Sequence, residues 1–155
     1  FIFNLFKDKY LHQNGATPCQ NDGVCLENGT CECPPGFEGD LCETFTREKI
    51  SGNLDVVSDC TGGSADTDTW SIGASASAFN EVLINNFHLP ALNIIATITD
   101  PSTIEIKEQF VGGPTSYTIF GSGTIEAEGQ LSLQYTIISD VPADTTNCTV
   151  DAIRQ

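Results

Sequence analysis

The sequence predicts an all-β protein in which a small disulfide-rich module precedes an antiparallel, up-and-down β-barrel of about eight strands. Three observations lead to this fold class. Five of the seven cysteines lie between residues 19 and 42, among Gly, Pro and Asn. From residue 46 onward Thr, Ile, Val, Ser and Gly dominate, and short β-branched segments alternate with turn-forming residues. After residue 15 the sequence shows no sustained helical periodicity.

Residues 1–15, FIFNLFKDKYLHQNG, form an apolar and aromatic lead. As a strand the lead would present apolar side chains on both faces, and as a short helix it would gather them in one stripe. Such side chains favour burial, so we expect the lead to dock head to tail on a neighbouring copy and to build an oligomer or a filament. Folding back onto its own chain is the alternative. The expected assembly residues are Phe1, Ile2, Phe3, Leu5, Phe6 and Tyr10.

Residues 16–43 form the Cys-rich module. A segment this small buries too little apolar surface to fold without cross-links, so its cysteines indicate disulfides and an oxidising compartment. The spacing contains no C-x2-C pair, and His12 and His88 are distant in the sequence, which argues against a zinc site. Five cysteines cannot all pair with one another, so at least one of them has no disulfide partner within the module.

Residues 46–155 contain eight candidate strands with turn signals such as Asp100-Pro101 and Val141-Pro142 between them. Consecutive hairpins in an up-and-down barrel need only short loops, and closure removes exposed edges. We therefore favour this barrel, with a β-sandwich as the alternative. The strands are expected at residues 52–58, 69–76, 80–87, 93–99, 103–110, 116–125, 130–138 and 147–153.

Cys60 follows the first expected strand and Cys148 begins the last. In a closed barrel these two strands are neighbours, so the two cysteines come within disulfide reach. The chain-entropy account gives about 4 to 5 kcal/mol, as an upper value, for closing a loop of roughly ninety residues. We therefore expect the Cys60–Cys148 disulfide; two unrelated buried thiols are the alternative.

The Cys-rich module resembles an EGF-like domain. The resemblance rests on the motif C-x-C-x2-G-F-x-G-x2-C, which runs from Cys31 to Cys42, preceded by CQNDGVC from residue 19. In that family six cysteines pair first with third, second with fourth and fifth with sixth. The first is absent here, so the resemblance implies the disulfides Cys19–Cys31 and Cys33–Cys42 and a free thiol at Cys25.

Residues 46–155 resemble the lipocalin-like barrel that follows an EGF-like module in surface lipoproteins of Bacteroidota. The shared features are a T-x5-G-x-L start at residues 46–54, NEVLINNF at 80–87, GSGTI at 121–125 and a cysteine in the last strand. Where that family usually has G-x-W, this chain has Gly52-Asn53-Leu54. The resemblance implies a second possible role, a cell-surface protein that holds a small apolar ligand in its barrel.

The charge and the residue types argue against several classes of function. The formal net charge is −15, with six Lys and Arg, which disfavours nucleic acid and anionic membranes as partners. The apolar runs are too short to span a bilayer, and the lead lacks the basic start of an intact signal peptide. His12 and His88 are the only histidines, and neither stands in a catalytic motif. We expect no enzyme activity, no cofactor and no metal, and we interpret the acidic pair Asp66 and Asp68 as solvated rather than calcium-binding.

Three short patterns are candidate glycosylation sites. Asn28-Gly-Thr30 and Asn147-Cys-Thr149 fit the N-glycan acceptor pattern. Asp144-Thr145-Thr146 resembles the O-glycan acceptor of Bacteroidota, and we expect it in a loop after Pro142. The candidate residues are therefore Asn28, Asn147 and Thr145.

Taken together, these features predict a non-enzymatic extracellular or cell-surface protein with a structural or adhesive role. It would assemble with itself, with surface glycans or other surface proteins as possible further partners. The alternative is a lipocalin-like binding protein. The two hypotheses differ in the barrel interior, which small barrels either fill with side chains or leave open for one ligand. The many Ile, Leu, Val and Phe in the strands, and the small residues at 74–78, favour a filled interior.

Overall fold

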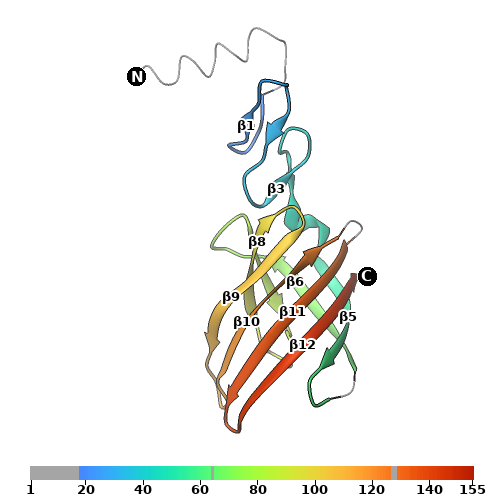
Figure 1. Ribbon diagram of the computed structural model, residues 1–155, viewed down its shortest axis with the longest axis vertical. Coiled ribbons are helices and arrows are strands. Elements are labelled where there is room, and N and C mark those ends of the chain that lie inside the picture. Colours follow the sequence, from blue (N-terminus) through green and yellow to red (C-terminus); the bar gives the residue numbers. More distant parts are fainter. Residues whose placement is uncertain (1–17, 64, 127–128) are drawn as a thin grey trace.

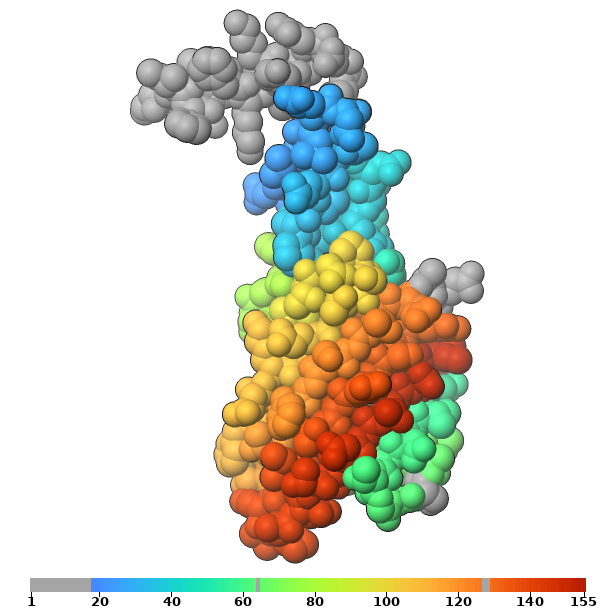
Figure 2. Space-filling model, viewed as in Figure 1, coloured from blue at the N-terminus to red at the C-terminus, as the bar shows by residue number. Residues whose placement is uncertain are grey.

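The computed structural model describes residues 18–63, 65–126 and 129–155 (Figure 1). The lead at residues 1–15, with its expected assembly residues, lies outside these ranges. The described chain is almost entirely β-structure, with one short 3-10 helix. The Cys-rich module stands on one end of an eight-stranded barrel (Figures 1 and 2).

The Cys-rich module contains two small antiparallel sheets. β1 (Val24–Cys25) pairs with β2 (Cys31–Glu32), and β3 (Phe37–Glu38) pairs with β4 (Thr44–Phe45). The 3-10 helix η1 (Thr46–Lys49) follows β4 and leads into the barrel. Strands of two residues cannot hold a sheet by themselves, so the module depends on its turns and cross-links.

The barrel consists of eight antiparallel strands in sequence order. Each strand pairs with its neighbours in the chain, and the last pairs with the first, so the barrel is closed and up-and-down. The predicted all-β class and eight-stranded barrel are therefore confirmed. The strands are β5 (Gly52–Cys60), β6 (Asp66–Ala74), β7 (Glu81–Asn85), β8 (Ile94–Asp100), β9 (Thr103–Val111), β10 (Tyr117–Ile125), β11 (Gln130–Asp140) and β12 (Ala143–Arg154).

The observed strand bounds differ most from the expected ones in β6, β7 and β12. β6 begins at Asp66, so Trp70 lies inside this strand rather than at its start. β7 ends at Asn85, before Phe87. β12 begins at Ala143, and Thr145 pairs with Ile138 of β11, so the expected loop at 144–146 is wrong. The polar residues at 144–146 have weak strand propensity, but each of them pairs with a residue of the long β11.

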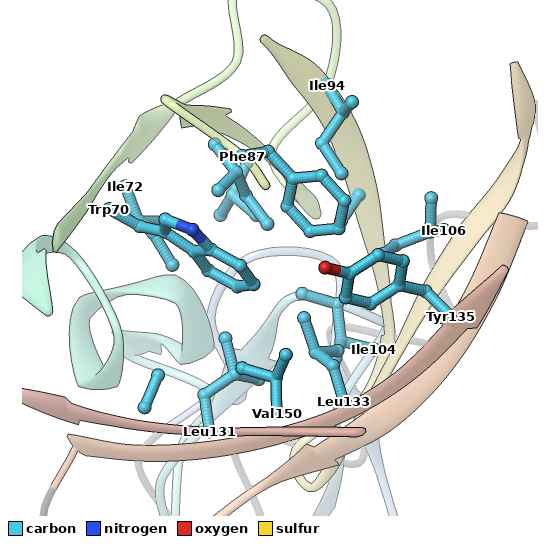
Figure 3. Packing of buried hydrophobic residues seen from close by; sticks show 14 of the residues in the cluster. Trp70, Ile72, Phe87, Ile94, Ile104, Ile106, Leu131, Leu133, Tyr135 and Val150 are labelled. Carbon is cyan, nitrogen blue, oxygen red and sulfur yellow. The ribbon is translucent and has the colours of Figure 1, made fainter. Parts of the chain in front are cut away.

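Inward-facing residues of the strands form one hydrophobic core (Figure 3). The rings of Trp70 and Phe87 lie 4.6 Å apart between centroids, and those of Phe87 and Tyr135 also lie 4.6 Å apart. Ile, Leu and Val side chains from the surrounding strands complete the packing, including Ile72, Ile94, Ile104, Ile106, Leu131, Leu133 and Val150.

Two glycines allow β10 and β11 to approach closely. A Cβ atom at Gly121 would overlap the Gln134 carbonyl oxygen, and one at Gly123 would overlap that of Ser132. The pairing of β10 with β9 also shifts register between Ile119 and Gly121. The GSG stretch is therefore a strand bend, as expected for glycines inside a strand.

Candidate functional site

Three disulfides cross-link the described chain. Cys19 is joined to Cys31 and Cys33 to Cys42 within the Cys-rich module. Cys60 is joined to Cys148, and the two residues lie directly opposite each other on β5 and β12. Cys25 is a free, exposed thiol.

The free thiol of Cys25 lies against a disulfide. Its Sγ is 2.7 Å from Sγ of Cys19 and accepts a hydrogen bond from the Cys19 backbone N–H at 3.2 Å. The β1–β2 hairpin places Cys25 directly opposite Cys31, so all three sulfurs lie within 4.8 Å of one another. Two of the sulfurs are bonded to each other, and this removes them as thiolate ligands for a metal.

Barrel residues fix the Cys-rich module in place through an aromatic cluster. The ring of Phe37 lies 4.9 Å from that of Phe45, and Phe79, in the loop between β6 and β7, lies 6.1 Å and 6.2 Å from these two rings. The Arg47 guanidinium stacks 4.5 Å over Phe45 and donates to the Phe79 carbonyl oxygen at 3.2 Å. Gly36, at φ +92°, has no room for a Cβ beside Asn80.

Residues 86–93 close the barrel end that is distal to the module. Asn86 and His88 adopt positive φ angles of 59° and 60°, and this backbone turn directs the fully buried Phe87 into the core. The Phe87 N–H donates to the Leu92 carbonyl oxygen at 2.8 Å, so the segment is a compact turn. Phe87 and Leu92 are the buried residues of this segment, and they fill the interior where a ligand would have to lie.

His88 packs on this closing segment beside Tyr135. Its Nδ1 lies 2.9 Å from the Tyr135 hydroxyl, and its ring is close to the Cys60–Cys148 disulfide. Burial lowers the pKa of His88, and the charge of Asp68 opposes this shift. Burial, with the same carboxylate, raises the pKa of Tyr135 far above its usual range, so its hydroxyl stays neutral. The neighbour of the histidine ring nitrogen is thus the neutral Tyr135 hydroxyl, and the two sulfurs near the ring are bonded to each other.

A shallow groove crosses the outer face of the barrel over β10, β11, β12 and β5. It has two connected parts, of about 550 and 410 Å³, which share Ser122, Gln134 and Thr149. Its lining is rich in hydroxyl and amide groups, and its charged residues are Asp59 and Asp151. Most of the lining residues belong to β10, β11 and β12, which run diagonally across the barrel in Figure 1.

An apolar patch borders this groove. Phe110 on β9 and Ile138 on β11 both pair with Thr118 of β10, and Phe120 follows two residues later on the same face. The side chain of Phe110 is 72% exposed, and those of Phe120 and Ile138 are also partly exposed. Outward aromatic side chains in such a group mark a candidate contact surface.

The three candidate glycosylation residues are all exposed. Asn28 lies in the β1–β2 turn, where its Oδ1 accepts hydrogen bonds from the N–H and hydroxyl of Thr30. Thr145 and Asn147 both lie on β12 rather than in a loop. The Oδ1 of Asn147 accepts a hydrogen bond from the Thr136 hydroxyl at 2.7 Å, and both residues line the groove.

Sequence reasoning missed two parts of this arrangement. Phe79 was not singled out. It directly follows the Ala- and Ser-rich stretch at 74–78, and a single aromatic residue in such a position indicates a packing contact. His88 was considered as a zinc ligand or a catalytic residue, whereas it is hydrogen-bonded to a side chain 47 residues away. Within the described residues, no helix is both long and apolar enough to cross a membrane.

Comparison with known proteins identifies the first part of the chain. Residues 12–42 match the profile of the EGF-like domain. The Cys-rich module is an EGF-like module. The chain is 55% identical over 40 residues to zonadhesin of Sus scrofa, a match that covers 24% of this chain and 2% of that protein.

Two other relatives share the EGF-like module. Stabilin-2 of Rattus norvegicus is 38% identical over 53 residues, which cover 32% of this chain and 4% of that protein. Latent-transforming growth factor beta-binding protein 1 of Homo sapiens is 47% identical over 34 residues, 22% of this chain and 2% of that protein. The chain thus spans only a small fraction of each relative.

A solved structure described as "Structure of EF1p2_mFAP2b bound to DFHBI" resembles this chain with a TM-score of 0.49 and 14% identity. The likeness covers 71% of this chain and 97% of that one.

Proposed function

We propose that this protein is a non-enzymatic extracellular structural or adhesive protein, in which an EGF-like module is fixed to a filled β-barrel. The observation that carries this proposal is the packed interior, where Trp70, Phe87 and Tyr135 contact one another in the space that a binding protein would leave for a ligand. Such a barrel serves as a rigid support, and its outer face is the surface available to partners.

Two further observations support an extracellular and adhesive role. The three disulfides are the type of cross-link that persists in oxidising compartments. The match of the EGF-like module to segments of zonadhesin and stabilin-2 favours the same setting. The exposed Asn28 and Thr145 are proposed positions for glycans on a bacterial or eukaryotic surface.

The proposal includes self-assembly, in which the lead of one copy docks in the outer groove of the next. The lead carries Lys7 and Lys9, two of the six cations of the chain, whereas the charged lining residues of the groove are Asp59 and Asp151. The apolar patch beside the groove matches the aromatic side chains of the lead.

The position of the groove favours contact between copies in a head-to-tail order. The lead precedes the EGF-like module in the chain, and the groove reaches Cys60, which ends β5 on the side of the barrel away from the module. A contact between two different surfaces that does not close into a ring extends into a filament.

The alternative, a lipocalin-like surface protein with an apolar ligand in the barrel, would require Phe87 and Leu92 to leave the interior. Phe87 is fully buried there, and its removal would expose Trp70 and Tyr135. Native mass spectrometry of the purified protein tests this directly. A stoichiometric apolar ligand would favour the binding protein over the structural one.

Assembly is tested by comparing the full chain with three variants in analytical ultracentrifugation and electron microscopy. We expect the full chain to assemble and the chain lacking residues 1–10 to remain a folded monomer. Thr149→Arg, in the middle of the groove, should also block assembly. The matched control is Thr97→Arg on the opposite wall, where Glu81 and Glu105 flank the new cation.

The outcomes separate the parts of the proposal. A full chain that stays monomeric, or a truncated chain that assembles as the full one does, contradicts docking of the lead. If truncation blocks assembly but Thr149→Arg does not, the lead docks on another surface.

A further inference from the structure

The EGF-like module contains one disulfide that touches a free thiol and one that does not. The Cys19–Cys31 bridge has the Sγ of Cys25 in contact with it, at 2.7 Å from Sγ of Cys19. The Cys33–Cys42 bridge is without such a neighbour among the sulfurs of the described chain, and Cys42 is fully buried. Within the described chain, only the Cys19–Cys31 bridge therefore has a free thiol in position for thiol–disulfide exchange.

The backbone holds the free thiol in this position. Cys25 lies at the end of β1, opposite Cys31, in a hairpin closed by the Leu26 N–H to Thr30 carbonyl hydrogen bond of 2.8 Å. The Cys19 N–H also donates a hydrogen bond to the Cys25 sulfur at 3.2 Å. A thiol fixed against a disulfide sulfur needs little reorganisation to attack it.

We propose that Cys19, Cys25 and Cys31 form a thiol–disulfide exchange site, in which the free thiol moves between Cys25 and Cys31. The Cys25 thiol loses its proton to solvent, and its thiolate attacks Sγ of Cys19. A Cys19–Cys25 bond forms as the Cys19–Cys31 bond breaks, and the electron pair leaves on Sγ of Cys31, which takes a proton. The number of thiols and disulfides is unchanged, so the step needs no oxidant or reductant.

The two pairings are close in chain entropy. The bridge from Cys19 to Cys31 spans 12 residues, and a bridge from Cys19 to Cys25 would span 6. Loop-closure entropy varies slowly with loop length. A twofold difference in loop length changes the ratio of the two pairings by about threefold. Both forms should therefore be populated. The free thiol is then on Cys25 of β1 in one form and on Cys31 of β2 in the other.

Alkylation of the native full chain tests the exchange. The protein is treated with N-ethylmaleimide at pH 8 without reductant, quenched in acid and digested, and the labelled cysteines are identified by mass spectrometry. We expect one label per chain, divided between Cys25 and Cys31 within about tenfold of each other. Label on Cys25 alone overturns the proposal, because the thiol then does not move.

A pair of variants provides an independent measurement. Cys31→Ser removes the present partner of Cys19, and we expect a Cys19–Cys25 disulfide and no free thiol. Cys25→Ser is the matched control, which retains Cys19–Cys31 and also has no free thiol. Circular dichroism of the barrel and an intact Cys33–Cys42 bridge show that each variant is folded. Two free thiols in folded Cys31→Ser would contradict the exchange geometry.

Discussion

The ring of Phe79, in the loop before β7, lies 6.1 Å from the ring of Phe37 in the EGF-like module. These residues are 42 positions apart in the chain, as read from their numbers, and they join the two parts of the molecule. Phe45 and the Arg47 guanidinium complete the contact on the linker side. A contact with several aromatic partners fixes the direction of the module, whereas a flexible linker would let it swing.

Phe79→Ala should loosen the module without unfolding the barrel. Aromatic pairs contribute about 0.5 to 1.5 kcal/mol each beyond burial, and the side chain of Phe79 is 65% exposed, outside the barrel core. We expect the connection at residues 43–51 to be cleaved several-fold faster in limited proteolysis, with little change in barrel melting temperature. Phe110→Ala, at a more exposed phenylalanine, is the control. Equal cleavage of both variants would show that the cluster does not hold the module.

Replacing both Cys60 and Cys148 with Ala should destabilise the barrel while leaving its fold intact. The bridge closes the chain across a sequence separation of 88 residues, and removing a native disulfide typically costs about 2 to 5 kcal/mol. Urea unfolding followed by near-ultraviolet circular dichroism measures this loss. The EGF-like disulfides remain in place in this variant, which chemical reduction would not achieve. A loss well below 1 kcal/mol would mean that the barrel closes equally well without the bridge.

Phe87→Ala should create a cavity at the distal end of the barrel. Removing a fully buried phenylalanine typically costs about 3 to 5 kcal/mol, because the surrounding side chains relax only partly. Thermal and urea unfolding measure the loss of unfolding free energy. The control is Phe110→Ala at an exposed position, for which we expect a change within about 0.5 kcal/mol. Similar values for the two variants would refute the role of Phe87 in filling the interior.

His88 should make the stability of the protein depend on pH below about 6.5. Burial holds the pKa of His88 below its ordinary value of 6.5, so the unfolded chain binds this proton first as the pH falls. Between the folded and unfolded pKa values, the unfolded state binds more protons, and the free energy of unfolding decreases with decreasing pH. This contribution is complete above the unfolded pKa and is lost as the pH falls through the folded one.

The matched variant for this pH dependence is His88→Gln, which keeps a hydrogen-bonding group beside Tyr135 but does not titrate. The difference in unfolding free energy between the two proteins, measured from pH 8 to pH 4.5, cancels the carboxylates common to both. We expect wild type to lose more stability than the variant as the pH falls. A difference that stays constant with pH would show that His88 titrates normally in the folded state.

Local pattern was sufficient to predict the architecture. Alternating β-branched residues marked every strand of the barrel, and Cys60 and Cys148 at its two ends indicated closure. The bounds were less predictable where polar residues extend a strand: Asp66 begins β6, and Ala143 begins β12. These residues have weak strand propensity and join the sheet because a longer neighbouring strand offers hydrogen-bonding partners.

The sequence by itself determined the class of fold, because strand alternation, turn residues and cysteine spacing are local properties. Only the tertiary structure decided which side chains meet. Phe87 reaches Trp70 and Tyr135 through a turn with positive φ on both sides, Phe79 reaches the EGF-like module, and Cys25 lies against Cys19. Such contacts depend on how closed strands and short loops pack in three dimensions, and residue spacing along the chain carries no direct signal of that packing.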